Sequence, residues 1–308
     1  MTMLSRVANK INWMARYLER AENTARIINV NTNLLLDLPK RVRLGWEPIV
    51  DITSQRVLFY SLYEEADEHS VVRFMVTDMR NPDSILNTLN MARENTRTIR
   101  DIIPREVWEQ VNTLYLNSKA NARSVTTQRH RYDYLRSVIL GVQTISGMLA
   151  GTMTHDEGYD FLRMGRNLER ADMTTRIIDV RSASLLPDML EDFSPFENLQ
   201  WVSVLKSLTA YQMYRRQIRQ RIRRPDVLKF LLQEEYFPRS FYHALCQANS
   251  CLNNLPHNKE PLKLINKLQR NLLAAKLDEF DQEKLHEFID ELQLGVIKIN
   301  DSIHETYF

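Results

Sequence analysis

The sequence predicts an all-α protein, a multi-helix bundle of about ten or more helices. Three observations lead to this fold class. Glycine and proline are scarce, at 7 and 10 of 308 residues, whereas the two together average roughly 12% of residues in proteins. No stretch shows the alternating pattern of a strand, and apolar residues recur at helical spacing. The segment 14–30 also reappears at 164–180, which predicts an internal pseudo-symmetric duplication.

Prolines and capping residues mark where the helices begin and end. Asp37 and Pro39 close the first helix, and the run 81–84, Asn-Pro-Asp-Ser, is typical of a helix start. Thr154 and Glu157 have the spacing of a capping box, which predicts another start. The expected helices are 5–36, 48–63, 70–77, 84–100, 104–119, 132–151, 157–184, further helices after residues 195, 225, 238 and 261, and 281–304.

One helix is expected to be uncharged but not membrane-spanning. The stretch 137–155 has no Asp, Glu, Lys or Arg, yet it contains Gln143, three glycines and several hydroxyl residues. A membrane span needs about 20 mostly apolar residues. Small residues at 137, 141, 144, 147 and 151 fall on one helical stripe, which predicts close contact with another helix.

Composition favours a cytoplasmic protein without a membrane anchor, metal or cofactor. The net charge of +2 gives no global attraction to nucleic acid or lipid. Cys246 and Cys251 form neither a disulfide framework nor a zinc-binding spacing, and the N-terminal residues lack a signal peptide core. No glycine-rich phosphate loop of the Rossmann or P-loop type occurs.

The repeat is the strongest signal in the chain. Residues 14–30 and 164–180 align at an offset of 150 without a gap, with eleven of seventeen positions identical. Positions 14, 18, 21, 25 and 28 follow heptad spacing and predict a core stripe in each copy. The charged members of the two copies are Arg16, Glu19, Arg20, Glu22 and Arg26, and Arg166, Glu169, Arg170, Asp172 and Arg176.

Three interpretations of these charges remain open: a partly buried network of Arg–carboxylate pairs, a ligand or partner site, and a solvated surface. The network is favoured, because Ile27 and Val30 lie within the polar arc. A carboxylate flanked by arginines has a low pKa, so it is a poor general acid or base near neutral pH. Such a cluster suits holding an anion, binding Mg²⁺ or locking helices together.

The paired Leu-Glu-Arg-Ala segments at 18–21 and 168–171, together with the stretches 70–74, 81–85, 92–95, 156–158, 211–216 and 237–240, resemble the bacterial alpha-E family. The resemblance covers essentially the whole chain and implies a single helical domain over 1–308. It implies as partners a circularly permuted ATP-grasp-type ligase and a transglutaminase-like protein, and a role in forming or modifying peptide or amide bonds. No catalytic activity of the domain itself is implied.

A second cluster of arginines lies at 215–224, with six arginines in ten residues. If this run is helical, Arg215, Arg216, Arg219 and Arg223 share one side and could contact phosphate or nucleic acid. The favoured alternative is a helix end whose arginines complement the helix dipole and pair with acidic neighbours, so nucleic acid is not the expected partner.

Three functions therefore stand beside one another. The chain is expected to be a non-catalytic or co-catalytic partner of an ATP-grasp-type ligase. Alternatively it is an enzyme or binding module for a phosphate or carboxylate ligand, or an RNA- or nucleotide-binding module that uses the run 215–224. The one ExxH pair, Glu283 and His286, has no second copy and so does not predict a di-iron site.

Overall fold

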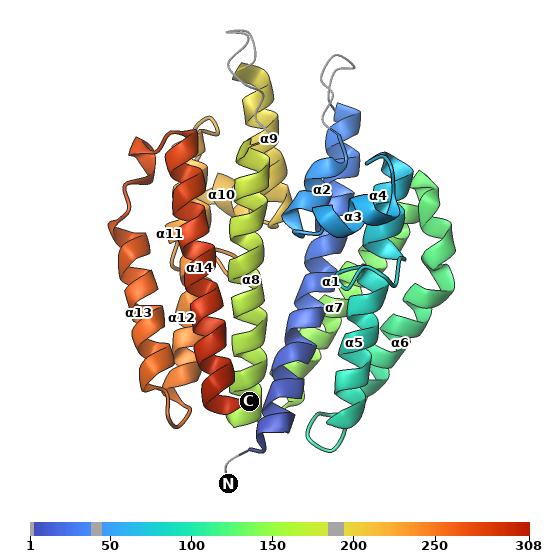
Figure 1. The fold of residues 1–308 in the computed structure, drawn as a ribbon, viewed down its shortest axis with the longest axis vertical. Coiled ribbons are helices and arrows are strands. Elements are labelled where there is room, and N and C mark those ends of the chain that lie inside the picture. The colour runs from blue at the N-terminus through green and yellow to red at the C-terminus, as the bar shows by residue number, and fades with distance from the viewer. Residues whose placement is uncertain (1–2, 38–44, 184–193) are drawn as a thin grey trace. The chain divides into compact units, whose positions relative to one another are not determined.

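A computed structural model describes residues 3–37, 45–183 and 194–308 of the chain. These residues form fourteen α-helices and two short 3₁₀ helices, and no strand occurs among them (Figure 1). The predicted all-α class is therefore confirmed. By the density of their contacts the residues divide into two compact units.

Unit 1 comprises residues 1–29, 45–169 and 307–308. It contains most of α1, the first half of α8 and all the helices between them. Their bounds are α1 Ser5–Asp37, α2 Glu47–Ile52, α3 Arg56–Leu62, α4 Glu68–Val76, α5 Ile85–Thr98, α6 Arg105–Asn121, η1 Ala122–Thr126, α7 Gln128–Thr152 and α8 Glu157–Ala183.

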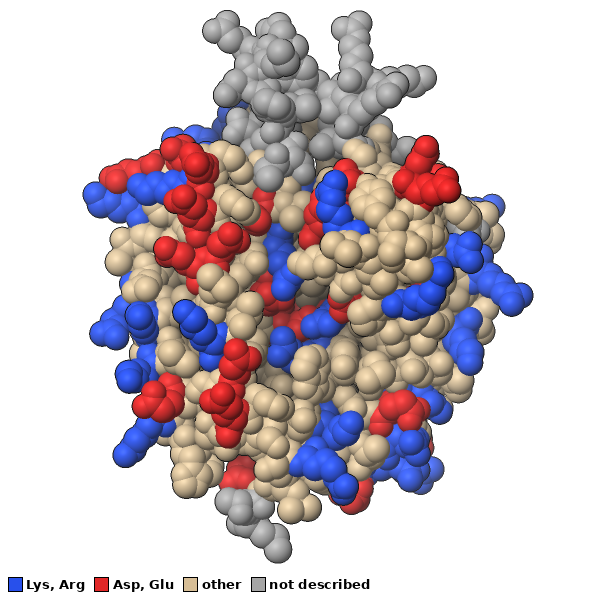
Figure 2. Space-filling view, viewed as in Figure 1, with Lys and Arg blue, Asp and Glu red and all other residues tan. Residues whose placement is uncertain are grey.

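Unit 2 comprises residues 30–44 and 170–306. It contains the end of α1, the second half of α8 and the C-terminal helices. Their bounds are α9 Ser194–Ser207, α10 Tyr211–Gln217, α11 Arg224–Gln233, α12 Phe241–Asn253, α13 Lys259–Ala274, η3 Leu277–Glu279 and α14 Gln282–Tyr307. On the face that Figure 2 shows, basic and acidic side chains are interspersed over each unit.

Side-chain caps mark the starts of several helices. Ser84 accepts a hydrogen bond from the backbone of Asn87 and opens α5, as predicted. The predicted capping box at Thr154 is wrong, because the Asp156 carboxylate instead accepts from the backbone nitrogens of Gly158 and Tyr159. The cap thus lies two residues later than the sequence suggested.

The segment 48–63 is two helices rather than the one predicted. Ser54 has a φ of 56°, in the left-handed region, and separates α2 from α3. A continuous right-handed helix cannot include such a residue. The sequence did not predict this break, because serine, unlike glycine, is not typical of the left-handed conformation.

The expected close contact along α7 is present at one glycine only. A Cβ added at Gly141 would lie 2.6 Å from Leu114 of α6, so glycine permits this packing. At Gly147 and Gly151 nothing lies within 4 Å. The prediction of a continuous contact stripe is therefore wrong for these two residues, which lie on an exposed side of the helix.

The repeated segments lie on the two long helices α1 and α8. The predicted core stripe is buried in both copies: Met14, Leu18, Ala21, Ala25 and Ile28, and Met164, Leu168, Ala171, Thr175 and Ile178. Ile27 and Ile177, which interrupt the polar arc, are also buried. The charged residues beside them are therefore held against the core rather than in open solvent.

Candidate functional site

Glu169 is the centre of a cluster of charged side chains in unit 1. Its carboxylate accepts from Arg16 Nε at 3.0 Å, and from Arg20 Nε at 2.6 Å and Nη2 at 3.1 Å. Only 1% of the Glu169 side chain is exposed, against 12% for Arg16 and 20% for Arg20. Arg20 therefore binds Glu169 through both of its oxygens, the geometry that guanidinium and carboxylate fit best.

Arg20 also binds a carboxylate outside the repeat. Its Nη1 donates to Asp83 Oδ1 at 2.6 Å, and Gln55 Nε2 donates to Asp83 Oδ2 at 2.6 Å. Asn81 Oδ1 accepts from the Asp83 backbone nitrogen at 2.9 Å and holds this residue in the turn before α5. We call Arg16, Arg20, Asp83 and Glu169 the Glu-Arg network.

Sequence reasoning missed Asp83 as a member of the network. The run 81–84 was interpreted only as a helix start, and Ser84 does cap α5. Asp83 itself does not cap the helix but points its carboxylate to Arg20. The available signal was an acidic residue next to the capping serine, although nothing in the sequence links it to Arg20, 63 positions away.

The charges of the network determine its protonation. Burial alone would raise the pKa of Glu169, but the charges of Arg20 and Arg16 outweigh burial and lower it to about 2. Burial would lower the pKa of Arg20, but Glu169 and Asp83 raise it overall. Glu169 is therefore ionised throughout the physiological range, and it cannot exchange a proton with a substrate near neutral pH.

The other predicted charges are placed along the same two helices. Glu22 pairs with Arg26 one turn later at 2.7 Å, and Asp172 pairs with Arg176 at 2.8 Å. Glu19 is 2% exposed and accepts a long hydrogen bond from Asn23. Arg166 and Arg170 are half-buried on α8. The structure thus brings Arg16 and Arg20 to Glu169, and pairs Glu22 and Asp172 with arginines of their own helices.

Aromatic side chains lie against one side of the network. Arg16 stacks over Trp13, with its Cζ 4.8 Å from the ring centroid, and Trp13 packs on Tyr17 with centroids 5.3 Å apart. Burial raises the pKa of Tyr17, and the charges of Arg20 and Arg16 partly oppose this. The phenol therefore stays neutral near neutral pH and is unsuited to proton exchange there.

A second polar contact joins α1 to α8 in unit 2. Arg181 Nη2 donates to Asn31 Oδ1 at 2.9 Å, and both side chains are buried. Burial lowers the pKa of Arg181 to about 10. The two residues are 150 positions apart, which is the offset of the repeat. This contact could not be predicted from the repeat, because positions 31 and 181 carry different residue types.

The arginine run does not form one helical face. α10 ends at Gln217 and α11 begins at Arg224, so Arg219 and Arg223 lie outside any helix. The predicted shared face of Arg215, Arg216, Arg219 and Arg223 is therefore wrong. Pro225 explains where α11 begins, because proline fits the first turn of a helix.

The individual arginines of the run have local partners. Arg215 donates to the Gln220 carbonyl at 2.7 Å, and Arg223 pairs with Asp226 at 2.8 Å. Arg216 and Arg219 are exposed. The run thus includes the connection between α10 and α11, and Arg215 and Arg223 stabilise it through their local contacts.

A family model described as "a predicted alpha-helical domain with a conserved ER motif" matches residues 3–308. The chain belongs to the Alpha-E family. The resemblance inferred from the paired Leu-Glu-Arg-Ala segments is thereby confirmed, and the Alpha-E match extends over both units.

Curated relatives of this Alpha-E chain occur in mycobacteria. Uncharacterized proteins of Mycobacterium bovis and Mycobacterium tuberculosis strain H37Rv are 21% identical to it over 315 residues. The match covers 94% of this chain and 35% of each relative, so the chain spans about a third of their length. No solved structure matches it significantly. None of the described helices is both long and apolar enough to cross a membrane.

Proposed function

We propose that this Alpha-E domain is a non-catalytic or co-catalytic partner of a cytoplasmic ATP-grasp-type ligase that forms or modifies amide or peptide bonds. A transglutaminase-like protein is proposed as a second partner. The family resemblance supports this role.

The observation that carries the proposal is that the charged groups of the Glu-Arg network already bind one another. Glu169 is held ionised by two arginines, so it is unsuited to proton transfer. Arg20 directs Nε and Nη2 to Glu169 and Nη1 to Asp83. An incoming anion would have to displace carboxylates that already satisfy this guanidinium. The network therefore supports a structural role within a partner protein better than a catalytic one.

We also propose that the chain arose by internal duplication. Eleven identities in seventeen positions support this. The contact between Asn31 and Arg181, at the repeat offset, is in keeping with two related helices that meet at equivalent positions. The duplication would place a Glu-Arg motif on each long helix of the domain.

The partner proposal is tested with purified components. The full chain is mixed with the ATP-grasp-type ligase of the same organism, and binding and the rate of ATP-dependent amide formation are measured. We expect a stoichiometric complex and a changed ligase rate. A ligase that neither binds the chain nor responds to it would contradict the proposal.

The substitution Glu169→Gln distinguishes our proposal from the alternative that the chain is an enzyme for an anionic substrate. In our proposal the substitution lowers thermal stability, because it leaves two arginines facing a neutral group. If the network were a substrate site, turnover of a phosphate or carboxylate substrate would fall while melting stayed unchanged. The two outcomes are distinguishable by differential scanning calorimetry on the same preparation.

RNA or nucleotide binding remains a second candidate because Arg215, Arg216 and Arg219 are exposed. Fluorescence anisotropy with a labelled single-stranded RNA tests it. Replacing these three residues with glutamine should weaken binding and flatten its salt dependence if the contact is real. Binding that is absent at low salt, or unaffected by the substitutions, excludes it.

A further inference from the structure

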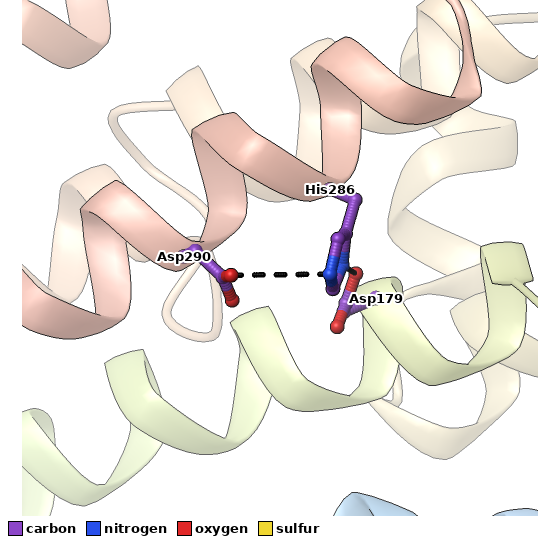
Figure 3. A group of neighbouring side chains, drawn as sticks. All are labelled: Asp179, His286 and Asp290. Atoms are coloured by element: carbon purple, nitrogen blue, oxygen red, sulfur yellow. Dashed lines mark hydrogen bonds and ion pairs between the residues drawn. The ribbon is translucent and has the colours of Figure 1, made fainter.

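A cluster of metal-ligating side chains lies in unit 2, outside the Glu-Arg network. Asp179 belongs to α8, and His286 and Asp290 belong to α14; one ligand atom from each lies within 4.8 Å of the others. Figure 3 shows the imidazole of His286 reaching from α14 toward Asp179 of α8, with Asp290 on the same helix as His286. We propose that His286 and Asp290, with Asp179 as a positioning residue, bind a divalent transition-metal ion of the zinc class.

The hydrogen bond to Asp179 orients the imidazole. His286 Nδ1 lies 2.7 Å from Asp179 Oδ1, so this nitrogen carries the donated proton. In a neutral imidazole the lone pair is then on Nε2, the nitrogen that a metal ion needs. A carboxylate that fixes the tautomer and raises the basicity of a ligating histidine is the usual outer partner in metal sites.

The free nitrogen faces a second carboxylate at a suitable distance. His286 Nε2 lies 3.8 Å from Asp290 Oδ2, too far for a hydrogen bond. Two ligands about 2.0–2.2 Å from a tetrahedral zinc ion are separated by roughly 3.4 Å. A small side-chain rotation therefore brings both atoms to an ion between them.

The backbone around the cluster is already arranged for this site. His286 and Asp290 are four residues apart and so lie on one side of α14. Gln282 Nε2 donates to Ser182 Oγ at 3.1 Å, which ties the first turn of α14 to α8 near Asp179. The two helices that supply the cluster are therefore held together independently of any ion.

Charge and exposure favour a cation at this position. Asp179, Asp290 and Glu287 all act electrostatically on His286. His286 and Asp290 are each 56% exposed, whereas Asp179 is 16% exposed. An ion can thus enter from solvent and keep water molecules in its remaining positions. An imidazole ligand selects zinc, cobalt, nickel or copper over magnesium and calcium.

Isothermal titration of the full chain with ZnCl₂ tests the proposal. We expect one saturable site whose affinity falls by more than tenfold in His286→Asn and in Asp290→Asn. Asp179→Asn should weaken binding by about 10- to 100-fold, as loss of an outer carboxylate does at other sites. Glu291→Gln, on an exposed position of the same helix, is the matched control and should bind as the wild type does.

Thermal melting gives a second measurement of zinc binding that is independent of the calorimetric titration. Zinc that binds the folded chain should raise its melting temperature, and this rise should be lost in Asp290→Asn, which leaves the Asp179–His286 hydrogen bond in place. Absence of saturable binding by the wild type would overturn the proposal. Unchanged affinity in both His286→Asn and Asp290→Asn would equally overturn it, because the ion would then bind elsewhere.

Discussion

Glu169 illustrates how a buried acid can stay charged. Its side chain is almost fully removed from water, which by itself favours the neutral form, yet Arg16 and Arg20 donate three hydrogen bonds to it. The network holds two positive charges, on Arg16 and Arg20, and Asp83 supplies the second negative charge through its contact with Arg20. The protonation of this residue is thus decided by its neighbours rather than by burial.

Replacing Glu169 with glutamine should destabilise the protein. The substitution keeps the shape of the side chain but leaves Arg16 and Arg20 facing a neutral amide. Breaking one partner of a buried ion pair typically lowers the free energy of unfolding by about 3 kcal/mol. Urea denaturation followed by circular dichroism measures the change.

The matched control is Glu109→Gln, which removes the partner of Arg105 in an ion pair whose side chains are 54% and 87% exposed. An exposed substitution of this kind should change the free energy of unfolding by no more than about 0.5 kcal/mol. Equal losses in the two variants would show that burial of Glu169 adds nothing.

Acid should remove the stabilising effect of Glu169. Its pKa is about 2 in the folded protein, below the ordinary value of 4.5. A lowered pKa stabilises the folded state above pH 4.5, and this contribution disappears as the pH falls from 4.5 toward 2. The difference in unfolding free energy between wild type and Glu169→Gln should therefore be constant near neutral pH and shrink in acid. A gap that widens in acid would contradict the low pKa.

At the scale of elements, α1 and α8 approach closely in unit 1 because of one glycine. Gly165 stands in the second copy of the repeat where the first copy has Ala15. A Cβ at Gly165 would lie 2.5 Å from the backbone oxygen of Asn12. A backbone atom cannot move aside as a side chain can, so the two helices could not keep this spacing with a larger residue.

Gly165→Ala should therefore destabilise the protein, although alanine favours helix. Helix propensity alone would stabilise by up to about 1 kcal/mol, but overpacking against the Asn12 backbone should cost about 1–3 kcal/mol. Gly147→Ala on α7 is the control, since nothing lies within 4 Å of its added Cβ. We expect opposite signs for the two substitutions in thermal denaturation, and a stabilised Gly165→Ala would refute the close approach.

At the scale of the whole molecule, α1 and α8 each contribute residues to both compact units. Because each of these helices runs from one unit into the other, we expect that unfolding of one unit also disrupts the helix in the other. The chain has a tryptophan suited to report on each unit, Trp46 in unit 1 and Trp201 in unit 2, and both are buried.

We expect the two units to unfold together. Variants that keep only Trp46 or only Trp201, with the other tryptophans replaced by phenylalanine, are unfolded in urea. In each variant the fluorescence transition should coincide with loss of helical circular dichroism, as in two-state unfolding. A fluorescence midpoint that separates from the dichroism of the same variant would show that one unit unfolds alone.

Local patterns in the sequence determined the all-α class, the long first helix and the capped start of α5. They did so because helix propensity, capping and apolar periodicity act between residues a few positions apart. The same patterns missed the break at Ser54, and they misplaced the capping residue of α8 and the extent of α10. In these places the conformation depends on backbone geometry that several residue types can adopt.

The sequence by itself determined that the repeated Arg and Glu residues lie beside a core stripe on two long helices. Only the tertiary structure decided that Arg20 binds both Glu169 and Asp83, and that Asp179 meets His286. Such contacts join residues far apart in the chain, and their energy depends on burial and on the position of every neighbouring charge. No local spacing contains that information, because it arises only when the helices pack.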